Sequence, residues 1–288
     1  MIDNFIPEFW ASIVLEAAQK AMVYAQDKVI NRNYEGEFAA KGDTVHIIGI
    51  GDVTVVDTAD GTDQAEGDEM LDADTILTIS QDKTFRFLVY DKQKTQAGGD
   101  ILSPYMRRAA YRLKDATDQY VASMYVDASS ANKIGTDASP KVPNTTAGDA
   151  QNVFNLIEDC SVLLSNNNVP TDGRWMIVPP WFSGLIVKDY HREGASAPGL
   201  SEIAHLTGKV AHIAGFDILE SNNVPNTSLT KYKIMFGNDD AITFADSLAG
   251  IEPLRHQKRW ADIVRGRHVY GGKVAYPDNL GVLTVNSS

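Results

Sequence analysis

The sequence has only one cysteine, Cys160, among its 288 residues. No intramolecular disulfide can therefore form. Cys160 is flanked by leucine and isoleucine at helical spacing, which is typical of a buried helix position. We expect a structural side chain there and not a catalytic thiol.

Long apolar runs are also missing. No segment approaches the roughly 18 to 20 apolar residues that span a bilayer. The first ten residues, MIDNFIPEFW, lack the basic start and the continuous apolar stretch of a secretory signal. These absences predict that the chain has no membrane partner. We expect it to be made in a reducing cytoplasm, or to reside in a particle assembled there.

Positive charge is scarce, with 26 basic against 38 acidic residues and a formal net charge of −12. A chain this acidic is poorly suited to gripping the phosphate backbone of a nucleic acid. It can lie near DNA and leave the DNA mobile, although solubility is the plainer interpretation of the charge.

Motifs for catalysis, cofactors and metals are absent as well. GIGDVT at 49–54 has Thr54 where the third glycine of a dinucleotide-binding loop belongs, and neither a P-loop nor a nucleophile elbow occurs. The six histidines do not follow metal-ligand spacing. The acidic stretch 58–74 lacks EF-hand spacing, so a solvated loop is the better interpretation. We predict no catalytic, cofactor-binding or metal-binding residues.

The N-terminal third of the chain predicts a helix followed by a hairpin. Pro7 and the apolar spacing that follows it favour a helix over residues 7–30, which we expect to pack on a neighbouring subunit. Residues 43–57 and 75–90 are rich in β-branched and aromatic side chains, as strands are, and the acidic stretch 58–74 joins them. An isolated hairpin is marginally stable in water, so this hairpin has to lie on a further surface, either of its own chain or of an adjacent subunit.

The rest of the chain predicts an α+β or mixed α/β arrangement. Ser103 and Pro104 begin the clearest helix, 103–127, which is roughly 35 Å long at 1.5 Å per residue. A polar linker at 128–148 indicates a subdomain boundary. Further elements are expected at 149–165 and 180–188 as helices, at 174–178, 210–221, 231–236 and 241–245 as strands, and in a strand-rich tail at 251–285.

Four stretches of this sequence, in this order, carry a resemblance to a known family. They lie at 6–47, with NRNYEGE at 31–37 and GDTV at 42–45; at 107–125; at 167–180 together with 215–225; and at 259–283. Together they cover nearly the whole chain. The sequence resembles the major capsid proteins of tailed bacteriophages with the Hong Kong 97 fold, and more narrowly the Salmonella-phage-type coat proteins and their relatives in phages of actinobacteria.

The resemblance implies an α+β Hong Kong 97-type fold with a defined division of the chain. Residues 1–40 correspond to the N-arm and 41–92 to the extended E-loop hairpin, which lies on an adjacent subunit. Residues 93–148 and 246–288 correspond to the peripheral domain with its long spine helix, and 149–245 to the axial domain. The axial segment leaves little room for the inserted domain that some family members carry.

The function implied by the resemblance is self-assembly into an icosahedral shell of hexamers and pentamers that encloses double-stranded DNA. The partners implied are other copies of the chain, a separate scaffolding protein and a portal, with the DNA contacted weakly and non-specifically; a decoration protein is left open. The implied location is the virion capsid, assembled in the cytoplasm of the host bacterium. We predict no enzymatic activity and no covalent crosslink. The alternatives are an encapsulin-like nanocompartment shell, a small cytoplasmic α/β enzyme, and a minor virion or decoration protein.

Large apolar side chains of the arm and hairpin are the candidate contacts between subunits. The predicted subunit-interface residues are Phe5, Phe9, Trp10 and Ile13 in the arm, and Phe85, Phe87 and Tyr90 in the hairpin.

Overall fold

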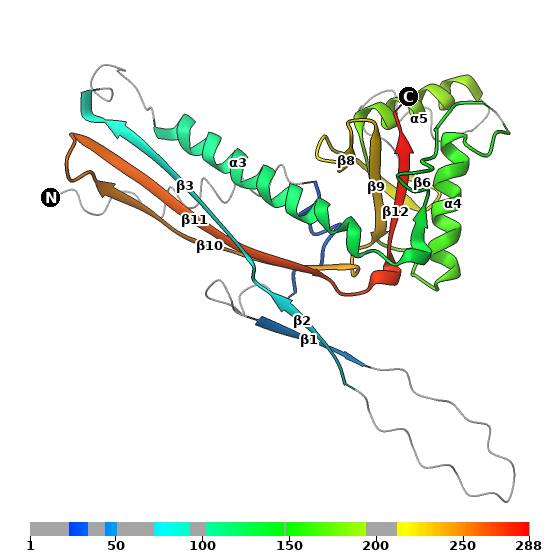
Figure 1. Cartoon of the computed structure of the whole chain (residues 1–288), viewed down its shortest axis with the longest axis horizontal. Helices are drawn as coiled ribbons and strands as arrows, with labels where there is room; N and C mark the ends of the chain where they lie inside the picture. The colour runs from blue at the N-terminus through cyan, green and yellow to red at the C-terminus, as the bar shows by residue number, and fades with distance from the viewer. Residues whose placement is uncertain are drawn as a thin grey trace, which may run out of the picture.

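A computed structural model describes residues 23–33, 44–50, 72–92, 102–146, 148–193 and 212–287. The molecule has a compact half built on a seven-stranded sheet and an extended half built on a three-stranded sheet, and a two-stranded hairpin projects from the junction between them (Figure 1). In the described part of the chain, no helix combines the length and apolar character that crossing a bilayer requires.

The compact half contains the seven-stranded mixed sheet and two helices, α4 (Val153–Asn166) and α5 (Pro180–Glu193). All five residues of β5 are buried, as a strand covered on both faces requires. The Asn152 side chain accepts a hydrogen bond from the Phe154 amide and so caps α4. The strands, in spatial order, are β4 (Lys133–Ile134), β12 (Leu280–Asn286), β9 (Lys231–Asn238), β5 (Arg174–Val178), β7 (Phe216–Glu220) and β6 (His212–Ile213), with β8 (Asn226–Thr227) on β9.

The two faces of the seven-stranded sheet have different neighbours. Met176 and Val178 on one face pack with α4 and α5 in a core that includes Cys160, which is buried as predicted. Trp175 and Ile177 on the other face pack with aromatic side chains of the extended half, Phe244 and Tyr270 among them. This second core joins the two halves.

The extended half is a sheet of three long strands with one helix on it. The strands are β10 (Ile242–Arg255), β11 (Ala261–Val274) and β3 (Gln81–Tyr90), and all pairings are antiparallel. Helix α3 (Leu102–Ser123) packs on one face through Met106, Ala110 and Leu113, which contact Ile251 and Val264. A short 3-10 helix, η1 (Met124–Asp127), follows α3, so the predicted spine helix 103–127 is confirmed in position.

The hairpin consists of β1 (Thr44–Ile50) and β2 (Asp72–Thr78), paired from Thr44↔Thr78 to Ile50↔Asp72. Leu77 and the adjoining Ile79 are fully buried with Ala245 and Val269. The base of the hairpin is therefore attached to β10 and β11.

Three predictions about these elements need correction. The predicted helix 7–30 is not helical over 23–30, which forms turns because its amides bond to other parts of the chain; its earlier part lies outside the described residues. The predicted strand 75–90 is two strands, because the chain leaves β1 after Thr78 and then pairs with β11. The predicted short strand 241–245 is the beginning of the 14-residue β10.

The C-terminal part of the chain contributes to both sheets. β12, within the predicted peripheral range 246–288, lies in the seven-stranded sheet between β4 and β9. The first six of its seven residues are buried, which suits an internal strand covered on both faces. β4, from the predicted linker, pairs with β12 as well. The strand predictions for 174–178 and 231–236 are confirmed.

Candidate assembly surface

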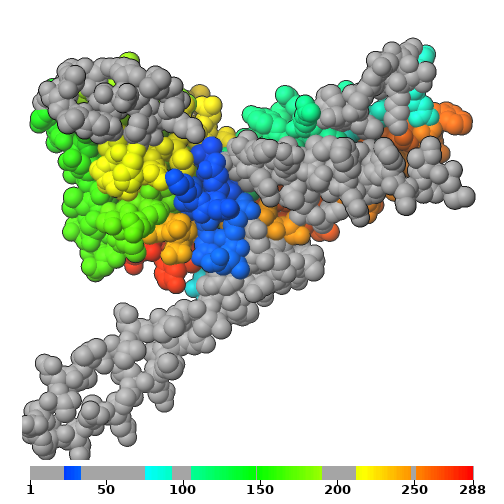
Figure 2. Space-filling view, turned by 180° about the vertical axis from the view of Figure 1, so that it is seen from behind, coloured from blue at the N-terminus to red at the C-terminus, as the bar shows by residue number. Residues whose placement is uncertain are grey.

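Residues 23–33, here called the anchor segment, connect the two halves of the molecule. They lie between the compact half and the long strands in the rear view (Figure 2). The Val23 amide donates to Asp118 of α3 at 3.2 Å, and Lys28 pairs with Asp217 of β7. Backbone bonds from Asn31 to Ile242 (2.8 Å) and from Phe244 to Asn31 (3.0 Å) attach the segment to β10. Its side chains Tyr24, Val29 and Ile30 are fully or almost fully buried.

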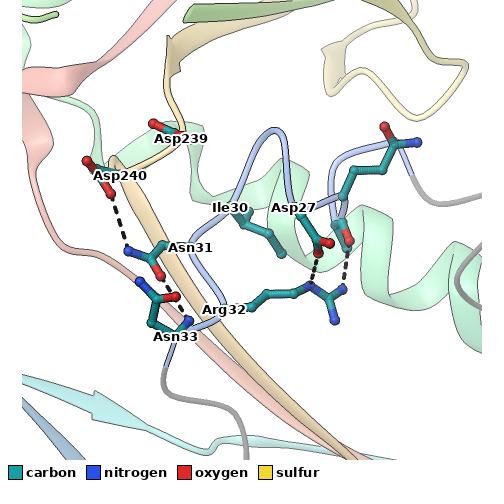
Figure 3. A pocket seen from close by; sticks show the side chains of 9 residues that line it. Asp27, Ile30, Asn31, Arg32, Asn33, Asp239 and Asp240 are labelled. Carbon is teal, nitrogen blue, oxygen red and sulfur yellow. Dashed lines mark hydrogen bonds and ion pairs between the residues drawn. The ribbon is translucent and has the colours of Figure 1, made fainter. Parts of the chain in front are cut away.

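Arg32 makes the polar contacts that close the anchor segment (Figure 3). Its guanidinium lies 3.2 Å from the carboxylate of Asp27 and donates to the Ala25 carbonyl at 2.7 Å. It also reaches Asp246 of β10 at 3.4 Å and lies 5.7 Å from the centre of the Phe244 ring. Since an arginine presents several donors in a fixed plane, one side chain can bind all of these groups together.

Asp118 is the buried acceptor for the start of the anchor segment. Burial raises the pKa of Asp118 above its ordinary value, while hydrogen bonds from the amides of Val23, Tyr24 and Ala25 oppose that rise. Burial likewise lowers the pKa of the neighbouring Lys114, and the charge of Asp118 opposes that shift. The Asp118 carboxylate therefore accepts hydrogen bonds from backbone amides at the start of the anchor segment, in place of carbonyl groups of a helix.

A pocket of about 740 Å³ lies beside the anchor segment, between it and the turn that carries Asp239 and Asp240 (Figure 3). Asn31 Nδ2 donates to Asp240 across it at 3.3 Å. Its polar groups bond to one another and to the chain, and among the described residues no cluster of histidine, cysteine or acidic side chains could hold a metal ion.

Among the described residues, the two strands of the hairpin pair only with each other. β1 and β2 form a separate two-stranded sheet, and Leu77 and Ile79 at its base are buried against β10 and β11. Ile76, one residue from that base, is 47% exposed. Two strands alone are marginally stable in water, so the outer part of this hairpin needs a further surface.

The face of the three-stranded sheet opposite α3 carries a row of apolar side chains. Leu88, Ile263 and Leu254 are paired across the three strands and therefore point to the same face. Leu88 and Leu254 are 39% and 40% exposed on either side of Ile263, which is buried, and Trp260, in the adjoining turn, is 83% exposed. We call these four residues the apolar row. Exposed apolar side chains gathered in one part of a surface are typical of a contact with other protein.

Charged pairs surround the apolar row. Arg265 forms two hydrogen bonds with Glu252, at 2.6 and 2.9 Å, and Arg267 forms two with Asp82, at 2.8 and 2.9 Å. At the end of the sheet, Arg255 bonds to Asp91 and Asp262 and lies 5.7 Å from the Trp260 ring. These pairs hold the strands in register around the apolar residues.

The structure brings the predicted interface residues Phe85, Phe87 and Tyr90 onto one strand but not onto one face. Phe85 and Phe87 are half-buried against α3 of the same chain, and Phe87 stacks on Tyr105 with ring centres 5.7 Å apart. The hydroxyl of Tyr90 accepts a hydrogen bond from Arg259 at 3.1 Å. Phe5, Phe9, Trp10 and Ile13 lie outside the described residues. All seven remain predicted interface residues.

Sequence reasoning missed Leu88, Leu254 and Trp260. A signal for Leu88 was available: in TFRFLVY the residues Phe85, Phe87 and Val89 share one face of a strand, so Leu88 has to lie on the other. Leu254 and Trp260 gave no such signal, because only the β10–β11 register aligns Leu254 with Leu88.

The comparisons with known proteins agree with this architecture. A family model described as phage capsid protein matches residues 73–285. The fold is similar to a structure from Mycobacterium phage Che8, at 30% identity and a TM-score of 0.69, with 98% of each chain covered. It is also similar to the capsid of cyanophage P-SCSP1u (19% identity, TM-score 0.68, 94% of this chain and 90% of that chain) and to a virus-like particle from Pyrococcus furiosus (13%, 0.57, 96% and 98%).

A search of curated protein sequences returned no match. The family model covers well over half of the chain, and the Che8 match extends over almost its full length. The chain thus belongs to the phage capsid protein family and is a major capsid protein with the Hong Kong 97-type fold, a structural component of an icosahedral phage shell.

Proposed function

We propose that this chain builds its shell from pentamers and hexamers of itself around double-stranded DNA, and that it has no enzymatic role. The observation that carries this is the hairpin, which is paired only with itself beyond its base in the described part of the chain. A second copy supplies the surface that the hairpin lacks. Contacts of such obligate assemblies bury more than roughly 2,000 Å² in total.

The two halves of the molecule have different roles in this proposal. We propose the extended half as the peripheral domain, with α3 as its spine helix, and the compact half as the axial domain around the fivefold and sixfold positions. The apolar row, Phe85, Phe87 and Tyr90, and the arm residues Phe5, Phe9, Trp10 and Ile13 supply contacts between copies. A separate scaffolding protein and a portal complete the particle, which assembles in the host cytoplasm.

Shortening the hairpin tests this function. Deleting residues 58–71 removes most of the acidic stretch 58–74 and leaves the ranges of both β1 and β2 intact. We expect a soluble, folded chain that no longer forms stable closed shells, as seen by electron microscopy. Normal particles of normal stability would remove the hairpin from the proposal.

The arm is tested separately with Phe9→Ala combined with Trp10→Ala. We expect folded protein that fails to close shells, because the large apolar groups that reach a neighbour are gone. Val162→Ala is the matched control, since Val162 is exposed on α4 in the compact half. Unchanged assembly of the double variant would exclude the arm.

A nanocompartment shell is the second candidate, because the fold, which is similar to that of the virus-like particle from Pyrococcus furiosus, does not by itself distinguish the two kinds of shell. The contents of purified particles distinguish a nanocompartment shell from a DNA-containing capsid. Purified particles that contain a protein cargo in place of DNA would establish the compartment and overturn the proposal for a DNA-containing capsid.

A further inference from the structure

The arginines of this chain fall into two groups. Six of the ten whose side chains are described have hydrogen-bond or ion-pair partners within the chain: Arg32, Arg174, Arg255, Arg259, Arg265 and Arg267. Four have no such partner among the described residues: Arg86, Arg107, Arg108 and Arg112. Three of these four lie within six residues of one another on α3.

The absence of partners on α3 is unusual for this chain. With 38 acidic residues against 26 basic ones, the chain has carboxylates in excess, and four of its ten described arginines bind one. Arg107, Arg108 and Arg112 are all exposed. The opposite side of α3, formed by Met106, Ala110 and Leu113, is packed on the sheet, so the arginines extend away from it.

Two exposed tyrosines lie among these arginines. Tyr105 is 55% exposed and Tyr111 is 57% exposed, and Tyr111 immediately precedes Arg112. Tyrosine hydroxyls and arginine guanidinium groups are both regular donors to phosphate oxygens. We call Arg107, Arg108, Tyr111 and Arg112 the cationic face of α3, the helix that runs alongside β3 in Figure 1; Tyr105, whose ring stacks on Phe87 of β3, borders this face.

We propose that the cationic face of α3 is the surface on which the shell meets the phosphate backbone of the packaged DNA. This rests on the proposed function, since it presupposes a shell that contains DNA. A shell whose every subunit carries a net charge of −12 repels DNA, so a phosphate can approach closely only where positive charge is locally concentrated.

The spacing of the arginines fits a DNA strand. Arg108 and Arg112 are four residues apart and lie on one side of the helix, which separates them by about 6 Å along its axis. Phosphates of one strand recur about every 3.4 Å along the duplex axis, so these arginines match alternate phosphates. Such a contact depends on the charge and spacing of the phosphates and not on base sequence, because base sequence is recognised through the edges of the bases in the grooves.

The test is binding of a short fluorescent DNA duplex to the full-length unassembled protein over a series of salt concentrations. Each neutralised phosphate contributes about −0.9 to the slope of log affinity against log salt, so replacing Arg107, Arg108 and Arg112 together by Gln should reduce the steepness of that slope by about 2.7. Replacing the same three by Lys retains the charge and should retain most of the slope. Lys188→Gln, Lys258→Gln and Lys273→Gln combined remove the same charge from exposed positions elsewhere and should leave the slope unchanged.

A second readout separates this inference from the function on which it rests. Shells of the triple Gln variant should form normally but lose their DNA at lower temperature than unaltered shells, as followed with a DNA-binding dye.

Equal slopes for the triple Gln variant and the unaltered chain, or no duplex binding by the unaltered chain at low salt, would overturn the inference. So would triple Gln protein that binds the duplex normally but cannot assemble, because the face would then contact another subunit. Failure of the unaltered chain to form shells at all would count against the proposed function and not against the duplex result.

Discussion

The two halves of the molecule bury their large side chains to different degrees. In the compact half, Trp175, Phe182, Phe216 and Phe236 are almost entirely inaccessible to solvent. The extended half and hairpin instead expose Ile76, Leu88, Tyr105, Tyr111, Leu254 and Trp260. The compact half also exposes single side chains such as Val162 and Leu229, but these four rings complete a core within one chain, whereas the extended half leaves Leu88 and Leu254 exposed on one sheet face for other molecules. Substitutions in the compact half should impair folding first, and substitutions in the extended half should impair assembly first.

The largest expected effect on folding is in the compact half. Phe236→Ala removes a fully buried ring that lies 5.9 Å from the Phe216 ring. We expect the free energy of unfolding of the unassembled chain to fall by about 3 to 5 kcal/mol, as measured by urea denaturation. A loss of less than about 1 kcal/mol would mean that this core is not closely packed.

A smaller effect is expected at the junction between the halves. Arg32→Ala removes charge-assisted hydrogen bonds to the anchor segment and leaves Asp246 with a neighbour in His268 at 2.9 Å. The expected loss is about 1.5 to 3 kcal/mol, with faster proteolytic cleavage near residue 33. Arg32→Lys keeps the charge but not the planar set of donors, so its free energy of unfolding should lie between those of the unaltered chain and Arg32→Ala. Cleavage at an unchanged rate would contradict the role given to Arg32.

Asp118 provides a pH-dependent comparison. Burial raises the pKa of Asp118 in the folded state above its ordinary value, so as pH falls the folded chain takes up the proton before the unfolded chain does. Its burial is thus unfavourable at neutral pH, and this penalty is relieved as pH falls through the raised pKa. Asp118→Asn should unfold at higher urea than the unaltered chain at neutral pH, and the difference should shrink as pH falls through the raised pKa of Asp118. A difference independent of pH would show that Asp118 does not titrate in this way.

Substitutions in the apolar row are expected to have the smallest effect on folding and the largest effect on assembly. Leu88→Ser with Leu254→Ser changes two half-exposed side chains, so the free energy of unfolding should change by no more than about 1 kcal/mol. Shell yield in sedimentation should nevertheless fall sharply. Val162→Ser is the matched control, since it alters an exposed side chain outside the row. Full assembly of the double variant would show that the row is not an interface.

The sequence predicted elements better than it predicted partners. The apolar spacing of α3 and the run RWMIV of β5 identified both elements, because burial imposes a period or a continuous apolar run on the chain. The break at Ile79 and Ser80 was not visible, since strand character continues through it and only the change of partner from β1 to β11 divides it. The position of β12 in the seven-stranded sheet was not visible either, because it depends on pairing with β4 and β9, which are distant in the sequence.

The candidate surface was predictable only in part, for a related reason. Large aromatics such as Phe85 and Phe87 attracted attention by size, yet α3 of the same chain covers part of them. Exposure depends on what lies opposite a residue, and that is a property of the register between strands. Arg107, Arg108 and Arg112 were visible in the sequence as the polar side of a helix, but their lack of acidic partners became apparent only with the positions of the carboxylates.

The anchor segment has a mechanical consequence. Val23 is bonded to α3, Lys28 to β7 and Asn31 to β10, so eleven consecutive residues connect the sheet of each half. A pull on the chain ahead of Val23 is therefore transmitted to both halves together. Any change in the angle between the halves has to stretch or break one of these three attachments.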